Sequence, residues 1–221
     1  MLVLALDTAT PAVTAGVVEL TADALVQRSV RVAHDARKHA ELLMPGVVAA
    51  CDEAGIGLRA LDAVVTGTGP GPFTGLRVGM VTAAALGDAL GIPVHGVCSL
   101  DAIAHGLGPL VGPVVVVTDA RRREVYWAAY GADGRRTEGP HVDAPAVLLE
   151  RIPGLGVAAA AGGSAEVTGL PVTGPVAPEP TALVAVAVAA LRSGVVPGPL
   201  EPFYLRRPDA VEPGARKRVS A

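Results

Sequence analysis

Leu2-Val3-Leu4-Ala5-Leu6-Asp7 is an apolar run that ends in a carboxylate, and residues 113–119, PVVVVTD, repeat this pattern in the second half of the chain. An apolar run of this length, bounded by turn residues, predicts a buried strand. In each half, two more strand-like segments, a helix-like segment and a further strand follow the run. The repetition predicts two lobes related by duplication.

Helical and alternating patterns place the elements of the two halves. The expected strands are 2–6, 13–18, 24–32, 63–66, 93–98, 113–118, 124–130, 136–142 and 156–161; the expected helices are 38–54, 74–90, 99–107, 144–151 and 181–192. This order is typical of the actin, Hsp70 and sugar-kinase (ASKHA) class of α/β folds, so we expect each lobe to have a mixed sheet and flanking helices. We expect a first lobe of residues 1–106 and a smaller second lobe of residues 107–201. Whether the segment 202–221 returns to the first lobe is left open.

Residues 67–79, GTGPGPFTGLRVG, form a Gly- and Pro-rich connection between an expected strand and an expected helix. Proteins of the α/β class commonly place ligand or partner chemistry in such a loop. The Gly-Lys-Ser/Thr ending of a P-loop and the dinucleotide fingerprint are both absent. A nest of amides could still accept an anion, with Thr74 as the helix N-cap and Arg77 one turn later. The loop itself carries neither a lysine nor a carboxylate, which favours a positioning role.

The helix expected after this loop carries small residues at four-residue spacing: Gly75, Gly79, Ala83, Gly87 and Gly91. A glycine inside a helix costs about 1 kcal/mol relative to alanine. Several glycines on one face therefore imply that another element approaches closely. The stripe predicts a close helix contact, either within the lobe or across an interface with a partner.

Asp7 stands where kinases of the ASKHA class hold a metal-bound nucleotide phosphate. Ala9 and Pro11 occupy the turn that follows, and a proline has no amide to offer a phosphate. We therefore favour an Asx turn that closes the hairpin. Asp119 ends the second apolar run in the same way, and Arg121 follows it.

Two other clusters have spacings that do not suit catalysis. His34 and His39 are five residues apart, which on a helix separates the imidazoles by about 140°, so we favour a packed or interface histidine over a metal pair. Ser99, Asp101 and His105 share one short expected helix, with Ser99 as its N-cap. Their arrangement predicts local capping rather than a catalytic triad.

Composition limits the classes of function. The formal net charge of −3 and the scarcity of aromatic residues (one Trp, three Tyr and two Phe) argue against a strongly nucleic-acid-binding surface. No apolar run approaches the roughly 20 residues of a membrane span, and no secretory signal is visible. Cys51 and Cys98 are expected to be reduced and buried. We expect a soluble cytoplasmic protein with no membrane contact.

Five segments together resemble the bacterial TsaB (YeaZ) family. They are Leu4-Ala5-Leu6-Asp7-Thr8, His39-Ala40-Glu41-Leu42-Leu43, Gly69-Pro70-Gly71-Pro72-Phe73-Thr74-Gly75-Leu76-Arg77-Val78-Gly79, Asp119-Ala120-Arg121 and Pro202-Phe203-Tyr204-Leu205-Arg206. The resemblance is dense over residues 1–130, thin over 131–198 and resumes at 202–206. The third segment is highly specific, although Pro72 stands where the family typically has Ser.

The resemblance implies a non-catalytic, cofactor-free role in tRNA modification. Such proteins pair with the catalytic homologue TsaD, are joined by the ATPase TsaE and reach tRNA indirectly through that complex. The complex transfers a threonylcarbamoyl group to adenosine 37 of tRNAs that read codons beginning with A. Family members also form homodimers when alone.

The resemblance also implies roles for particular residues. The partner interface is implied on the two helices of the first lobe, at His39, Leu42, Leu43, Val47, Gly75, Leu76, Gly79, Met80, Ala83 and Gly87. The family loop is represented by Gly69, Pro70, Gly71, Phe73, Thr74, Gly75 and Arg77. The vestiges of nucleotide turns are Asp7, Thr8, Asp119 and Arg121.

The alternative is an active enzyme, either the threonylcarbamoyltransferase itself or a small-molecule kinase that binds Mg-ATP. A transferase would need a His-x-x-x-His metal pair, which the sequence lacks. A kinase would need a Gly-rich phosphate turn after Asp7, and a metallopeptidase fails on the same missing ligands. We therefore favour the scaffold hypothesis. The sequence leaves open whether a nucleotide binds at the partner interface and whether the basic tail contacts tRNA.

Overall fold

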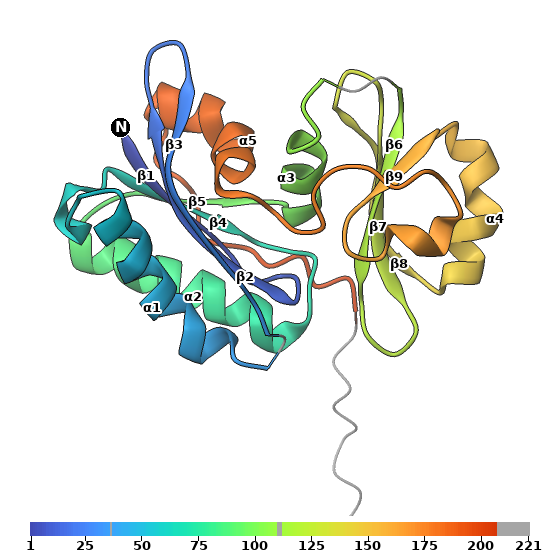
Figure 1. Cartoon of the computed structure of the whole chain (residues 1–221), viewed down its shortest axis with the longest axis horizontal. Coiled ribbons are helices and arrows are strands. Elements are labelled where there is room, and N and C mark those ends of the chain that lie inside the picture. The colour runs from blue at the N-terminus through green and yellow to red at the C-terminus, as the bar shows by residue number, and fades with distance from the viewer. Residues whose placement is uncertain (36, 110–111, 207–221) are drawn as a thin grey trace, which may run out of the picture.

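The computed structural model describes residues 1–35, 37–109 and 112–206 and has two lobes side by side, each built on one sheet (Figure 1). The sheet of the first lobe has the strand order β3-β2-β1-β4-β5. Its strands are β1 (Leu2–Asp7), β2 (Ala12–Leu20), β3 (Leu25–His34), β4 (Ala63–Gly67) and β5 (Val94–Val97). The first three strands form the expected antiparallel meander, whereas β1, β4 and β5 run parallel. The sheet is therefore mixed, as expected.

Helices cover both faces of this sheet, as Figure 1 shows. Helices α1 (His39–Glu53) and α2 (Phe73–Leu90) pack on one face, and α5 (Pro180–Ser193) packs on the other. Alternate residues of β1 serve the two faces, so that Leu4 and Leu6 join the core under α1 while Val3 and Ala5 join the core under α5. Burial on both faces explains why β1 is apolar throughout instead of alternating.

The sheet of the second lobe repeats the plan with the order β8-β7-β6-β9. Its strands are β6 (Val114–Asp119), β7 (Val125–Tyr130), β8 (Arg136–Asp143) and β9 (Ala159–Ala161). Helix α4 (Pro145–Leu155) packs on one face with the 3₁₀ turn η2 (Ala165–Thr168), and α3 (Ser99–His105) packs on the other. Two mixed sheets with flanking helices are the expected actin-like, ASKHA-type architecture.

Helix α5 belongs to the first lobe, so the expected assignment of residues 107–201 to the second lobe is wrong for this helix. Its side chains Leu183, Val184 and Leu191 lie in one apolar core with β1, β2 and β4. The face of the sheet opposite α1 and α2 is apolar and must be covered, and the chain returns from the second lobe to cover it. Residues 202–206 also return to the first lobe, and residues 207–221 lie outside the described residues.

Two expected helix caps are wrong, although the helices themselves form where expected. Helix α2 begins at Phe73 with Pro72 at the N-cap, so Thr74 lies in the first turn. Helix α3 has Cys98 at its N-cap, which frees the hydroxyl of Ser99 for another contact.

The remaining short element is a 3₁₀ turn, η1 (Leu58–Ala60), which connects α1 to β4. No helix of the described residues is long and apolar enough to cross a membrane.

Candidate functional site

Asp7 is buried at the end of β1, with 1% of its surface exposed. Its Oδ1 accepts the amide N–H of Ala9 at 2.9 Å, which is the expected Asx turn. Its Oδ2 accepts the hydroxyl of Ser99 at 2.5 Å, and the oxygen of that hydroxyl accepts the amide of Gly69 at 3.2 Å. Burial raises the pKa of Asp7 to about 6, although the hydrogen bonds from Ser99 and Ala9 and the charge of His39 oppose the rise. The carboxylate of Asp7 thus holds the Gly/Pro loop in place through the hydroxyl of Ser99.

Thr8 holds the start of α2 against the same turn. Its hydroxyl donates to the carbonyl of Gly75 at 2.7 Å and accepts the amide of Gly79 at 3.0 Å. A Cβ at Gly75 would lie 2.6 Å from the Thr8 carbonyl, and a Cβ at Gly79 would collide with the Thr8 hydroxyl. A Cβ at Gly71 would likewise collide with the backbone of Ala9. These glycines are needed because the helix and the turn are in direct contact.

The glycine stripe of α2 therefore faces into its own lobe. Farther along the helix, a Cβ at Gly87 would collide with the side chain of Val94 on β5. The sequence left open whether the stripe makes its close contact within the lobe or across an interface with a partner. In the structure the contact is within the lobe. The closest partners are a turn and a strand, and a Cβ at Gly75 would also lie 3.5 Å from the His39 ring at the start of α1.

The expected partner-interface residues are correspondingly buried, with the exception of Leu42, which is half-buried. The buried side chains are in contact with their own lobe, and an interface at these residues stays a prediction. The outer surfaces of the same helices carry other apolar side chains, and the exposed large ones are Met44, Val48 and Val81. Any partner of these helices would meet this surface, not the stripe.

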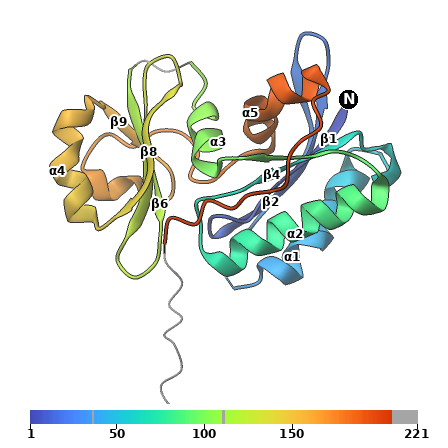
Figure 2. The ribbon, with the colours of Figure 1, turned by 180° about the vertical axis from the view of Figure 1, so that it is seen from behind.

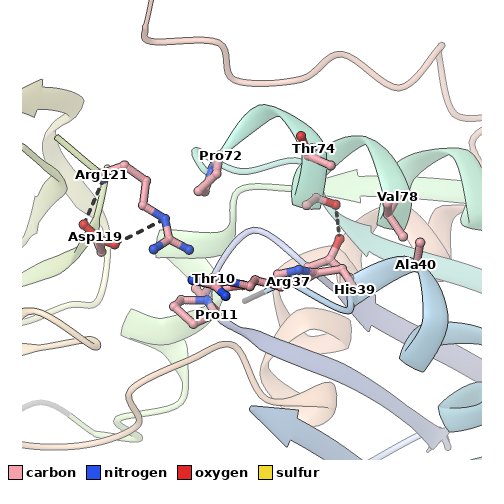
Figure 3. Close-up of a pocket in the computed structure, with 12 residues that line it drawn as sticks. Thr10, Pro11, Arg37, His39, Ala40, Pro72, Thr74, Val78, Asp119 and Arg121 are labelled. Atoms are coloured by element: carbon pink, nitrogen blue, oxygen red, sulfur yellow. Dashed lines mark hydrogen bonds and ion pairs between the residues drawn. The ribbon is translucent and has the colours of Figure 1, made fainter. Parts of the chain in front are cut away.

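A cavity of about 240 Å³ lies where the two lobes meet (Figure 3). Arg37 and Thr74 line it from the first lobe, while Asp119 and Arg121 line it from the second. The amide of Arg121 donates to Asp119 Oδ1 at 2.8 Å, and its Nε lies 3.6 Å from Asp119 Oδ2. The structure thus brings Thr8, Asp119 and Arg121 to one cavity, whereas Asp7 is buried and does not line it; that these residues are vestiges of nucleotide turns stays a prediction.

His39 is buried at the start of α1, where its Nε2 donates to the carbonyl of Thr10 at 2.9 Å. This hydrogen bond ties the helix to the β1–β2 turn. His34 lies on the exposed end of β3, before the helix begins. Within the described residues, no group of three or more His, Cys, Asp or Glu side chains is placed to hold a metal ion.

The other candidate residues are dispersed. Ser99 bonds to Asp7, and Asp101 accepts the hydroxyl of Tyr130 at 2.8 Å, while His105 is exposed. Both cysteines are free and buried, and burial raises the pKa of the Cys98 thiol to about 12. Neither a triad nor a reactive thiol is assembled from these side chains.

The closing motif packs on the Gly/Pro loop, a contact that sequence reasoning did not find. The ring of Tyr204 lies 4.5 Å from that of Phe73, and Arg77 Nε donates to the Tyr204 hydroxyl at 2.9 Å. The amide of Phe203 donates to the carbonyl of Thr68 at 2.9 Å. Arg77 therefore points to the C-terminal segment and not into the nest of amides where we expected it.

Arg206 continues this contact to the second lobe. Figure 2 shows the C-terminal segment, in red, passing from the first lobe to the second. Its guanidinium donates to the carbonyl of Ala120 at 2.9 Å and lies 3.2 Å from the carboxylate of Glu124. The five residues 202–206 thus bridge the loop of one lobe and the β6–β7 turn of the other.

Comparisons with known proteins agree with this geometry. The family model described as TsaD, tRNA N6-adenosine threonylcarbamoyltransferase, matches residues 32–193. An uncharacterized protein of Mycobacterium tuberculosis is 56% identical over 208 residues, which cover 94% of this chain and 93% of that protein. The tRNA threonylcarbamoyladenosine biosynthesis protein TsaB of Escherichia coli is 34% identical over 160 residues, which cover 69% of this chain and 66% of that protein.

Solved structures point the same way. A Pseudomonas aeruginosa protein described as similar to peptidase YeaZ has a TM-score of 0.75 and 30% identity, covering 93% of this chain and 99% of its own. YeaZ from Pseudomonas aeruginosa has a TM-score of 0.68 and 29% identity, and the match covers 87% of this chain and 93% of that protein.

Proposed function

The chain belongs to the TsaB (YeaZ) family, and from this premise we propose that it is a non-catalytic subunit of a tRNA threonylcarbamoylation complex. Its role in tRNA threonylcarbamoyladenosine biosynthesis follows from its homologues. The finer proposal is that it supports a TsaD-like catalytic subunit, together with a TsaE-like ATPase, in modifying adenosine 37 of tRNAs that read codons beginning with A.

The observation that carries the non-catalytic proposal is the internal use of the Asp7–Thr8 turn. The family model that matches the chain is named for an enzyme, so the distinction depends on this site. A kinase-like or transferase-like centre would need this turn open to a metal-bound phosphate. Here the carboxylate oxygens of Asp7 accept hydrogen bonds from the Ser99 hydroxyl and the Ala9 amide. The Thr8 hydroxyl forms hydrogen bonds with the backbone at the start of α2. The turn supports a helix in the place where an enzyme would hold a nucleotide.

Pairing with the catalytic subunit is proposed on the outer surface of α1 and α2. Met44, Val48 and Val81 are large apolar side chains exposed on these two adjacent helices. Exposed apolar side chains that cluster on neighbouring helices favour a protein partner. The same surface would serve a homodimer when the partner is absent.

The test is reconstitution with the TsaD-like and TsaE-like proteins of the same organism and a tRNA transcript, with the modified nucleoside measured by mass spectrometry. We expect modification only when all components are present. Asp7→Asn should retain the rate within about threefold, because a catalytic carboxylate would contribute about 10²–10⁴-fold.

Asp23→Asn, in the exposed turn between β2 and β3 and away from the proposed pairing surface, is the matched control. A loss of a hundredfold or more in Asp7→Asn, with the complex intact and the control active, would establish the enzyme alternative. Stoichiometric Mg-ATP binding by the chain alone in calorimetry would do the same.

A further inference from the structure

Four arginines from separate parts of the chain surround the place where the lobes meet; we call Arg37, Arg77, Arg121 and Arg206 the arginine rim. Arg37 and Arg121 line the same cavity from opposite lobes, as Figure 3 shows. Arg206 binds the carbonyl of Ala120, the neighbour of Arg121. Arg77 binds the hydroxyl of Tyr204, two residues before Arg206. The rim thus combines one shared cavity lining with two contacts made through the closing motif.

The charges of the rim are incompletely balanced. Within the described part of the chain, the guanidinium groups of Arg37 and Arg77 form no ion pair with a carboxylate, although the backbone amide of Arg37 donates to Asp35 and the contact of Arg77 is to a neutral phenol. Arg206 is paired with Glu124. Arg121 is paired with Asp119, whose side chain is 41% exposed, and exposed pairs of this kind are weak. The chain is negative overall, but a local field depends on where the charges lie.

The rim also collects the accessible aromatic side chains. Tyr126, Trp127 and Tyr130 are buried in the second lobe. The remaining aromatic residues, Phe73, Phe203 and Tyr204, are all at least partly exposed and lie in the contact between the closing motif and the loop. Tyr204 is 41% exposed, and Phe73 and Arg77 hold its ring in place.

We propose that the arginine rim and Tyr204 form an RNA-contact surface, in which the arginines bind phosphates and the tyrosine ring stacks on an unpaired base. Arginine neutralises backbone phosphates, and an aromatic ring held rigidly at a positive surface accepts any exposed base. The choice of RNA over other polyanions rests on the proposed function, which places a tRNA at the complex. An acidic protein partner would use the charges but would have no need of the presented ring.

The test uses the purified full chain and fluorescence anisotropy with a labelled RNA stem-loop and a fully paired RNA of equal length, over a range of salt concentrations. We expect tighter binding of the stem-loop. Arg37→Gln and Arg121→Gln should each lower the slope of log affinity against log salt by about 0.7–0.9. Tyr204→Ala should weaken stem-loop binding by about 5- to 150-fold, and Tyr204→Phe should retain most of it.

Arg59→Gln and Arg135→Gln are the matched controls, because both arginines are exposed and lie in η1 and in the β7–β8 hairpin, outside the rim. Equal losses in controls and rim variants would overturn the inference, as would the absence of RNA binding at low salt. Binding that survives the rim variants but disappears when residues 207–221 are deleted would also overturn it. So would rim variants that lose the catalytic partner while retaining RNA.

The reconstituted complex separates this inference from the proposed function. Absence of modification with the wild-type chain would contradict the proposed function. Normal modification in which the rim variants leave the KM for tRNA unchanged would contradict only the RNA-contact inference. A raised KM with kcat retained would support both.

Discussion

At the scale of single residues, the carboxylate of Asp7 has a structural use at the end of β1. Here the carboxylate is buried and bonded to Ser99, whose hydroxyl oxygen in turn holds the Gly69 amide. A cluster that is fully hydrogen-bonded in this way stabilises one backbone arrangement and leaves little capacity for a ligand.

The titration of Asp7 gives a prediction about pH. Burial raises its pKa from 3.8 to about 6 in the folded chain, so the folded chain binds the proton more tightly than the unfolded chain. The contribution of Asp7 to the free energy of unfolding is therefore largest near pH 4, falls as the pH rises to about 6 and is constant above. Asp7→Asn removes this fall, so the stability of wild type minus that of the variant should decrease by on the order of 3 kcal/mol from about pH 4 to pH 7.

Urea unfolding at several pH values measures this difference. Asp88→Asn, whose carboxylate is exposed, should follow the wild-type curve. Parallel curves for wild type and Asp7→Asn would show that the raised pKa is wrong.

Glycine at position 79 is predicted to be required by contact rather than by helix propensity. In Gly79→Ala the new Cβ collides with the Thr8 hydroxyl, so we expect a loss of about 1–3 kcal/mol in the free energy of unfolding. Gly46→Ala on α1 is the matched control, because its Cβ would meet only the side chain of Ala15 at 3.9 Å. The control should be stabilised by up to about 1 kcal/mol. Similar stabilisation of both variants in chemical denaturation would contradict the contact.

At the scale of elements, α1 and α2 each have one face committed to the sheet and one face free. Gly75, Gly79 and Gly87 let α2 approach the β1–β2 turn and β5, whereas Gly91 is the exposed C-cap of the helix. The opposite surface carries Met44, Val48 and Val81 in solvent. A partner is therefore predicted to dock without disturbing the stripe.

Charge placed on this outer surface should break pairing and leave the lobe folded. Val81 is 66% exposed, so Val81→Arg should preserve the circular dichroism spectrum while weakening co-purification with the catalytic partner by at least about tenfold. Val196→Arg, at an 88% exposed position outside α1 and α2, is the control and should pair normally. Normal pairing of Val81→Arg would place the interface elsewhere.

At the scale of the whole molecule, the C-terminal segment joins the two lobes. Tyr204 packs on the loop of the first lobe, and Arg206 binds the turn between β6 and β7. This link is separate from α3, which packs between the sheets. The relative position of the lobes, and with it the cavity between them, depends on both.

Removing the link should loosen the turn that it holds. Arg206→Gln loses the contacts to Ala120 and Glu124, so we expect amide hydrogen exchange over residues 119–124 to quicken by roughly 5- to 10-fold, the equivalent of one net hydrogen bond. Arg192→Gln, on α5 in the first lobe, should leave that turn unchanged. Unchanged exchange in Arg206→Gln would show that α3 alone sets the arrangement of the lobes.

Much of the fold could be predicted because its information is local. The apolar runs at β1 and β6 and the helical periods of α1 and α2 are set by neighbours within a few residues, and these elements lie where expected. Caps were less predictable: helix α2 begins one residue before Thr74, and the hydroxyl of Ser99 bonds to the distant Asp7 in place of its own helix. For the candidate site, the sequence pointed to Asp7 and Thr8, but not to the hydrogen bonds by which they hold Ser99 and the start of α2.

The sequence by itself determined the duplicated order of strands and helices, the Gly/Pro loop and the family, since each is written in contiguous residues. The tertiary structure alone decided that the glycine stripe faces inward, that α5 covers the first sheet, that Tyr204 packs on Phe73 and that Arg37 and Arg121 line one cavity from opposite lobes. These are contacts between residues far apart in the chain, and their geometry follows from how whole elements pack. The periodicity of one segment does not determine which side chains of distant segments will contact it.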